Sequence, residues 1–221
     1  MANERTDEYL PEYRSLSRRG EAETRVKGSR FFGLALPAKD ESDVEESLEE
    51  MRSSHPEAGH HAFAYRLGLK VPRERYSDDG EPSQTAGMPL LSLLEGRELV
   101  QSLLIVSRIF GGTLLGKGGL VRAYTDAGRA ALLRARPALY VCGYVLALSV
   151  PYELWGELEY GLRSRRVGLS EVDYGERVEV EIWVPHDRRG EIEGWLAELS
   201  AGSLTPVDRG RKYVARKVIE E

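Results

Sequence analysis

The sequence is poor in the residues that staple small or secreted proteins together. It has one cysteine, Cys142, and four histidines among 221 residues. One cysteine excludes an internal disulfide framework, a CxxC redox motif and a cysteine-rich zinc site. We therefore expect a fold that depends on its own hydrophobic core, which a chain of this length can bury, with no metal and no cofactor.

Long apolar stretches are also missing. No run approaches 18 apolar residues, so the sequence predicts no membrane-spanning helix and no membrane partner. Residues 1–22 are polar, mixed in charge and without the apolar stretch of a secretory signal. We interpret them as an N-terminal arm, docked or frayed, of a cytoplasmic protein.

The charge is unevenly distributed along the chain. The net charge is −5, which argues against a protein that coats nucleic acid through bulk charge. Residues 39–57 hold eight acidic and two basic residues, whereas residues 101–136 hold six basic residues and one acidic. The second segment is therefore where an anionic partner could bind, although its cations could equally form a solvated helix surface.

The first half of the chain predicts a mixed α+β domain. The patterns predict strands over residues 29–37, 60–67 and part of 99–110, and helices over 42–54, 90–95 and 120–134. Ser42 and Glu45 have the spacing of a capping box at the start of the first helix. Residues 76–89 are rich in turn-forming residues and predict a loop.

The pattern changes after Pro137. Strands are expected over residues 140–150, 168–174, 178–184 and part of 204–218, with helices over 152–165 and 189–199. This βαββαβ order is that of a ferredoxin-like domain. The predicted organisation is thus a two-domain α+β protein: an arm (1–22), an N-terminal domain (23–136) and a ferredoxin-like C-terminal domain (137–221).

A glycine-rich turn over residues 111–119 is the first candidate site. Its spacing nearly matches a nucleotide-binding phosphate loop, but Gly118 stands where a Ser or Thr would hold magnesium. The remaining readings are an anion site at the start of the next helix, or a tight turn only. The candidate binding residues are Arg108, Gly111, Gly112, Gly116, Lys117, Gly118, Gly119 and Arg122.

An acidic loop over residues 77–82 is the second candidate. Asp78, Asp79 and Glu81 could bind a hard cation, but the spacing is not that of an EF-hand. The favoured reading is a turn in which carboxylates accept backbone N–H groups and Gly80 supplies a positive φ.

Two adjacent histidines, His60 and His61, follow the first helix. Neighbouring residues of a strand point to opposite faces, so the pair is a poor metal site. The catalytic candidates are His61, Asp79 and Glu81, with His61 as the proton-transfer group. A Ser77–His61–Asp79 triad can be written on paper, but no nucleophile-elbow motif supports it.

Several stretches together resemble the YigZ/IMPACT family. They span about residues 25–135 in the family's order, and Ile109 departs from the family's usual aromatic. The stretches are residues 27–31 (KGSRF), 55–61 (HPEAGHH), 64–65 (AY), 76–82 (YSDDGEP) with 85–87 (TAG), and 106–124 (VSRIFGGTLLGKGGLVRAY).

The resemblance implies a fold and a class of function. It implies a ribosomal-protein-like βαβ sandwich, like the fourth domain of elongation factor G, followed by a ferredoxin-like domain. The eukaryotic relatives regulate translation by competing for the activator of a starvation kinase. For bacterial members, nucleic-acid or ribosome binding is the usual suggestion.

Three hypotheses follow. The first is a regulatory protein that binds the ribosome, RNA or a translation-related protein through the basic glycine turn. The second is an enzyme acting on a small phosphate-containing substrate at a His/Asp/Arg site. The third is an adaptor that uses the acidic helix 42–54. The sequence favours a binding protein over an enzyme and leaves the oligomeric state open.

Overall fold

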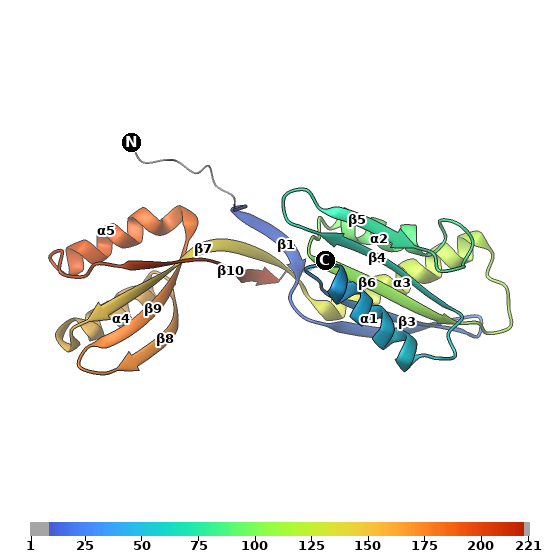
Figure 1. Ribbon diagram of the computed structural model, residues 1–221, viewed down its shortest axis with the longest axis horizontal. Helices are drawn as coiled ribbons and strands as arrows, with labels where there is room; N and C mark the ends of the chain where they lie inside the picture. The colour runs from blue at the N-terminus through green and yellow to red at the C-terminus, as the bar shows by residue number, and fades with distance from the viewer. Residues whose placement is uncertain (1–8, 219–221) are drawn as a thin grey trace. The chain divides into compact units, whose positions relative to one another are not determined.

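The computed structural model describes residues 9–218 as two compact units (Figure 1). Of the described residues, the N-terminal unit holds 13–140 and 215–218, and the C-terminal unit holds 141–214 and 9–12. Each unit combines helices with an antiparallel sheet. The expected two-domain α+β fold is therefore confirmed.

A five-stranded antiparallel sheet forms the centre of the N-terminal unit. Its strands, in spatial order, are β2 (Gly20–Val26), β3 (Ser29–Pro37), β6 (Ser102–Ile109), β4 (His60–Leu67) and β5 (Arg73–Ser77). β3 and β4 have the bounds that the hydrophobic pattern predicts.

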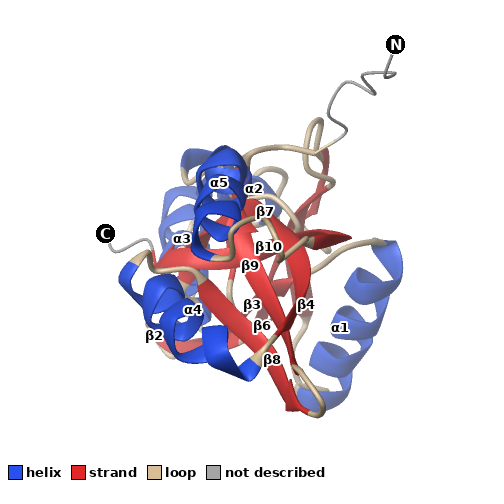
Figure 2. Ribbon diagram, turned by 90° about the vertical axis from the view of Figure 1, so that its left-hand side faces the viewer, coloured by secondary structure: helices blue, strands red, loops and turns tan. Residues whose placement is uncertain are grey.

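Both faces of this sheet are covered by helices. α1 (Glu41–Ser54) lies on one face, and α2 (Gly87–Gly96) and α3 (Lys117–Ala135) lie on the other (Figure 2). Along β6, Leu104 and Val106 pack toward α2 and α3, whereas the alternate residues pack toward α1. This two-sided burial explains why β6 is an unbroken apolar run.

The structure corrects the expectation of a frayed N-terminal arm. The range expected for the arm, residues 1–22, contains β1 (Glu12–Leu16) and the start of β2, so the frayed interpretation is wrong from residue 12 onward. In β2, the exposed charged residues Glu21, Glu23 and Arg25 alternate with half-buried small or β-branched residues, which gives an edge strand only a weak hydrophobic signal. Residues 1–8 of the expected arm lie outside the described residues.

The starts of two helices also differ from expectation. Asp40, not Ser42, caps α1: its carboxylate accepts the backbone N–H groups of Ser42 and Asp43 at 3.0 and 3.2 Å. The Ser42–Glu45 capping box is therefore wrong. α3 begins at Lys117 rather than at residue 120, so Gly118 and Gly119 lie in its first turn.

The C-terminal unit has the ferredoxin-like arrangement. Its five-stranded sheet has the order β1, β7, β9, β8, and β10 also pairs with β7, which places the last strand beside the first strand of the βαββαβ unit. Its elements are β7 (Pro137–Val150), α4 (Tyr152–Ser164), β8 (Gly168–Tyr174), β9 (Val178–Pro185), a short 3-10 helix (His186–Arg188), α5 (Arg189–Leu199) and β10 (Val207–Val218). Across residues 9–218, no helix combines the length and the apolar character needed to cross a membrane.

Candidate functional site

The glycine turn and the acidic loop meet at one end of the N-terminal sheet. Strand pairing places Arg108 of β6 opposite His60 of β4 and Phe31 of β3. Beyond β6, the Gly111 N–H donates to Ser29 Oγ at 3.1 Å. Segments from four parts of the sequence therefore converge here.

Arg108 is held inside this convergence. Its guanidinium donates to Glu81 Oε1 at 2.7 Å, and the Tyr124 hydroxyl donates to the same oxygen at 2.8 Å. The side chains of Arg108 and Glu81 are only 7% and 3% exposed. Burial, and then the charge of Glu81, raise the pKa of Tyr124, so its hydroxyl keeps its proton. Arg108 therefore ties the acidic loop to β6 and does not extend into solvent.

The other two carboxylates of the acidic loop, Asp78 and Asp79, accept backbone N–H groups. Asp78 accepts the N–H groups of Gln84, Ala86 and Gly87 at 2.8–2.9 Å, which fixes the start of α2. Asp79 accepts the N–H of His61 at 2.6 Å. Within residues 9–218, no three His, Cys, Asp or Glu side chains are grouped to hold a metal ion. This geometry supports the turn reading of the loop.

The two histidines point to opposite faces of the sheet. The His61 ring nitrogen Nδ1 lies 2.7 Å from Ser107 Oγ, and both residues are buried. His60 Nδ1 lies 2.7 Å from the Asp79 carbonyl oxygen. Asp79 contacts His61 through the main chain, and Ser77 Oγ accepts the Asp79 N–H, so no triad is assembled. The buried position of His61 does not support the expected proton-transfer role.

His61 should make the stability of the fold sensitive to acid. Burial lowers the pKa of His61 below its ordinary value of 6.5. As the pH falls below that value, the unfolded chain binds the proton first, so the free energy of unfolding decreases. We expect this decrease between about pH 7 and about pH 5 to be shallower in His61→Asn than in the wild type.

Urea unfolding followed by far-UV circular dichroism measures this slope. Replacing the exposed His186 by asparagine removes an imidazole without disturbing the Ser107 contact, and that control should keep the wild-type slope. Equal slopes in wild type and His61→Asn would contradict the assignment.

The glycine turn leads into the N-terminal end of α3 and leaves that end exposed. Gly112 and Gly116 have φ values of +82° and +71°, which a side chain would strain. Gly116 is the N-cap, no side chain caps the helix, and its first turn holds no acidic residue. Lys117 and Arg122 are exposed, and an Arg122 nitrogen lies 3.8 Å from the Cβ position of Gly118. The free N–H groups and two cations thus form a positive surface.

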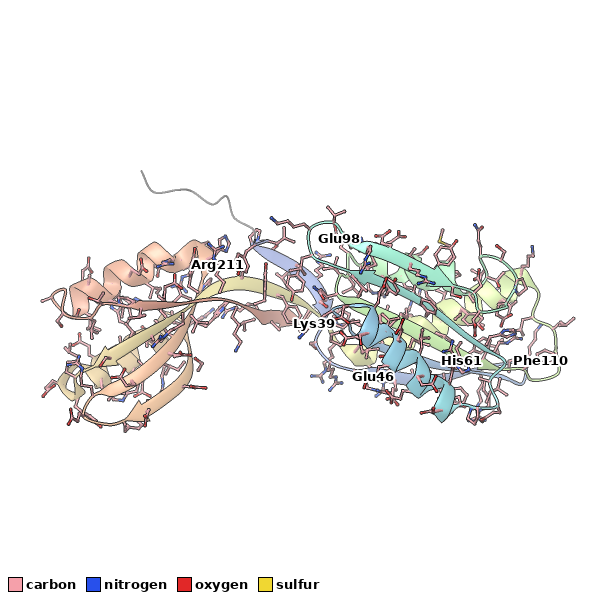
Figure 3. All side chains as sticks on the ribbon, viewed as in Figure 1. Lys39, Glu46, His61, Glu98, Phe110 and Arg211 are labelled. Carbon is pink, nitrogen blue, oxygen red and sulfur yellow. The ribbon has the colours of Figure 1, made fainter. Side chains whose placement is uncertain are left out.

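A pocket of about 520 Å³ lies beside this helix end. Phe110 and Leu114, which are 54% and 84% exposed, are among its apolar lining residues. Figure 3 shows Phe110 at the end of the N-terminal unit, where it directly follows β6. The pocket is lined by His60, Gly80, Glu81, Pro82, Arg108, Phe110, Leu114, Leu115, Gly116, Lys117 and Leu120.

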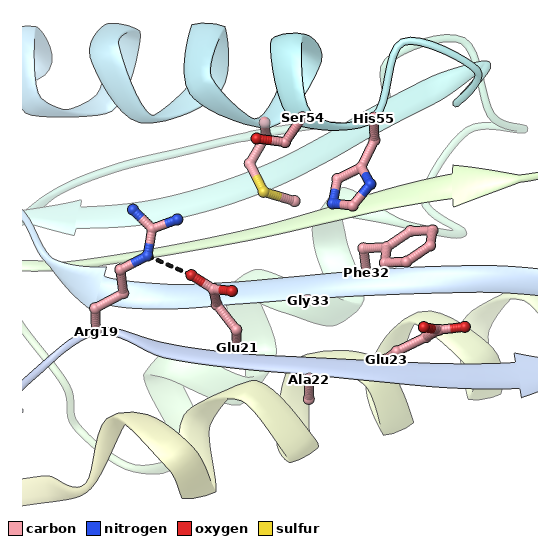
Figure 4. A pocket seen from close by; sticks show the side chains of 9 residues that line it. Arg19, Glu21, Ala22, Glu23, Phe32, Gly33, Ser54 and His55 are labelled. Carbon is pink, nitrogen blue, oxygen red and sulfur yellow. Dashed lines mark hydrogen bonds and ion pairs between the residues drawn. The ribbon is translucent and has the colours of Figure 1, made fainter.

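A smaller hollow of about 260 Å³ lies on the α1 face, beside the end of α1 and over β2 and β3 (Figure 4). Its cation is neutralised: Arg19 binds Glu21 and also binds Glu50 of α1 in a bidentate pair. Phe32 stacks on His55 at a ring distance of 4.0 Å. The paired charges make this hollow a poor anion site.

Some residues of the site were absent from the sequence-based candidates. Ser29 accepts a hydrogen bond from Gly111 of the glycine turn, and Tyr124 donates one to Glu81. Both residues belong to stretches that resemble the family. Their role required tertiary pairing, because they lie 95 residues apart in the sequence. His60 and Phe110 line the pocket. Only the alternation of adjacent strand residues hinted that one histidine would face a site.

Comparison with known proteins agrees with this arrangement. The sequence matches the Impact N-terminal domain over residues 27–132 and the Domain of unknown function (DUF1949) over residues 148–203. It is 32% identical to the IMPACT family member YvyE of Bacillus subtilis (strain 168), over 95% of this chain and 96% of YvyE. The chain belongs to the IMPACT family.

Further comparisons support the assignment of this chain to the IMPACT family. The IMPACT family member YigZ of Escherichia coli (strain K12) is 31% identical over 81% of this chain and 89% of YigZ. A solved structure described as "Crystal structure of an hypothetical protein" covers 90% of this chain and 98% of its own, with 28% identity and a TM-score of 0.58. The family resemblance seen in the sequence motifs is therefore confirmed. The similarity to the solved structure covers both units of this chain.

Proposed function

We propose that this IMPACT family protein is a cytoplasmic, translation-associated regulator that binds RNA, alone or within the ribosome, through the glycine turn. The observation that carries the proposal is the exposed N-terminal end of α3, with Lys117 and Arg122 beside uncapped N–H groups. Helix N-termini bind phosphate because their N–H groups and dipole favour negative charge. The family resemblance implies a role in translation, and this is why RNA is proposed as the partner.

The buried ion pair changes the part that Arg108 plays in this proposal. Arg108 and Glu81 neutralise each other inside the unit, so Arg108 positions the turn. The exposed contacts to RNA are assigned to Lys117 and Arg122. Lys27 is also exposed. It precedes Gly28, which packs so closely on Gly111 that a Cβ at Gly28 would lie 2.9 Å from the Gly111 carbonyl oxygen. Lys27 therefore adds an exposed cation to the positive surface beside the glycine turn.

Removing the two exposed cations should reduce both the RNA affinity and its salt dependence. For Lys117→Ala/Arg122→Ala, we expect the slope of log K against log salt to become shallower by about 1.4, which corresponds to two lost phosphate contacts on a single strand. Filter binding of single-stranded RNA between about 50 and about 200 mM salt measures the slope. Co-sedimentation with ribosomes over the same salts tests the larger partner.

A matched variant controls for the loss of charge. Lys39→Ala/Arg73→Ala removes one lysine and one arginine that are exposed elsewhere in the same unit, and it should bind RNA as the wild type does. If neither RNA nor ribosomes bind at any salt while the protein is folded, the proposal fails. If both double variants lose the same affinity, the contact is not at the glycine turn.

The pocket favours a second candidate, an enzyme acting on a small phosphate-containing substrate. His60 lines the pocket and places an imidazole ring there, and Lys117 lines the same pocket. The acidic-helix adaptor has less support, because Glu50 of α1 is already paired with Arg19. Glu46 of the same helix is exposed (Figure 3).

A further inference from the structure

We infer that the pocket beside the glycine turn receives one nucleotide, with its phosphate at the N-terminal end of α3 and its base against Phe110. The inference rests on the proposed function, because the same helix end would hold the phosphate. It adds a defined subsite and a ligand class to the proposed function, in which the surface contacts only the phosphate backbone of RNA.

The phosphate end of the pocket is built from Gly116 and Lys117. The backbone N–H groups after Gly116 lack a side-chain cap, and both residues line the pocket. Lys117 adds a full positive charge at the same place. A phosphate that bound there would be stabilised by the helix dipole and by charge-assisted hydrogen bonds.

Arg108 supplies a second, independent indication of a ligand. It lines the pocket, its side chain is 7% exposed, and its Nε is buried without a hydrogen-bond partner. Its Nη2 reaches Ser29 Oγ only at 3.5 Å, the outer limit of a hydrogen bond. Buried polar groups of native proteins are nearly always partnered, so this guanidinium retains donor capacity that a ligand oxygen would satisfy.

The other end of the pocket is apolar and suits a flat ring. Phe110, Leu114 and Leu115 are lining residues, and more than half of the Phe110 surface is exposed. The Cζ of Arg108 lies 5.5 Å from the centroid of the Phe110 ring, which places a cation over the aromatic face. Exposed aromatics next to cations are stacking platforms for unpaired bases.

The size and the charge of the pocket match one nucleotide. A volume of about 520 Å³ falls in the range of small-molecule sites. Glu81 also lines the pocket, but its charge is balanced by Arg108, so Lys117 and the helix end leave the site net positive. The hollow on the α1 face lacks this surplus, because glutamates neutralise its arginine.

Three probes separate the parts of the ligand. AMP carries both base and phosphate, ribose 5-phosphate lacks the base, and a hexamer of adenylate presents the same unit within RNA. By calorimetry on the full chain, we expect Phe110→Ala to weaken AMP about tenfold and to leave ribose 5-phosphate unchanged. Lys117→Ala should weaken all three probes. Tyr160→Ala, which removes an aromatic that is 76% exposed in the other unit, should change none of them.

The outcomes distinguish this inference from the proposed function. If the hexamer binds through Lys117 and Arg122 but Phe110→Ala changes neither AMP nor the hexamer, the nucleotide subsite is overturned and the proposed function stands. If AMP binds through Phe110 but the hexamer does not bind, the subsite stands for free nucleotides and RNA binding fails. If AMP does not bind to the folded protein, the subsite is overturned.

Discussion

Replacing Glu81 by alanine should lower the free energy of unfolding by about 3–5 kcal/mol, among the largest effects of a single substitution in this protein. Glu81 Oε1 accepts bonds from Arg108 at 2.7 Å and from Tyr124 at 2.8 Å, and both partners are buried. The substitution leaves the Arg108 charge inside the unit without a counter-charge. It also leaves the Tyr124 hydroxyl without its acceptor.

Companion variants test whether the loss comes from the uncompensated charge. Tyr124→Phe deletes one hydrogen bond and keeps the ion pair, so it should cost about 1 kcal/mol. Adding Arg108→Met to Glu81→Ala removes the orphaned charge and should recover part of the stability, because the two residues are energetically coupled. Urea unfolding followed by far-UV circular dichroism measures each value. If the double variant is as unstable as the sum of the single variants, the ion-pair account is wrong.

Local patterning was sufficient for most of the fold. The ferredoxin-like order is visible because each C-terminal element carries its own periodicity, such as the alternation along β9, whose buried residues include Val178, Val180 and Ile182. β3 and β4 were also predicted with the bounds that the structure has. In these segments one or both faces are buried, so the hydrophobic pattern records the contacts that the strand will make.

The first strands and the helix caps escaped prediction for a physical reason. β2 is an edge strand whose charged side chains satisfy each other on the surface, as where Glu23 accepts bonds from both Arg25 and Arg30. Besides its backbone pairing with β3, this strand buries only part of two small apolar side chains, Ala22 and Val26, so its hydrophobic signal in the sequence is weak. The choice of Asp40 over Ser42 as the cap depends on backbone angles, which composition does not determine.

The candidate site was predicted in its parts but not in its connections. The sequence motifs indicate Arg108, Glu81 and Lys117 as site residues. The motifs predict that Arg108 contacts the binding partner, whereas in the fold its side chain points inward to Glu81. The sign of a local charge segment does not tell which cations remain exposed, since a carboxylate 27 positions earlier in the chain neutralises one of them.

Gly111→Ala should be the most disruptive substitution within the glycine turn. A Cβ at Gly111 would lie 1.9 Å from the carbonyl carbon of Gly28 and 2.2 Å from the Ser29 nitrogen. These are backbone atoms at the end of the turn between β2 and β3 and at the first residue of β3, so no side chain can move aside to relieve the clash. We expect a loss of about 3 kcal/mol, at the upper end for overpacking. RNA affinity should fall as well, because the start of α3 is displaced with the turn.

Two other glycines separate the clash from the loss of backbone freedom. At Gly112 a Cβ would meet nothing within 4 Å, but the φ of +82° strains an alanine by about 1 kcal/mol. At Gly59 the space is equally open and φ is not positive, so Gly59→Ala should change stability by no more than about 0.5 kcal/mol. Thermal and urea unfolding of the three variants should therefore rank them Gly111, Gly112, Gly59. If the three variants are equally stable, the close approach of Gly111 to Gly28 does not hold the turn, and the open end of α3 must be positioned by Ser29 and Arg108 alone.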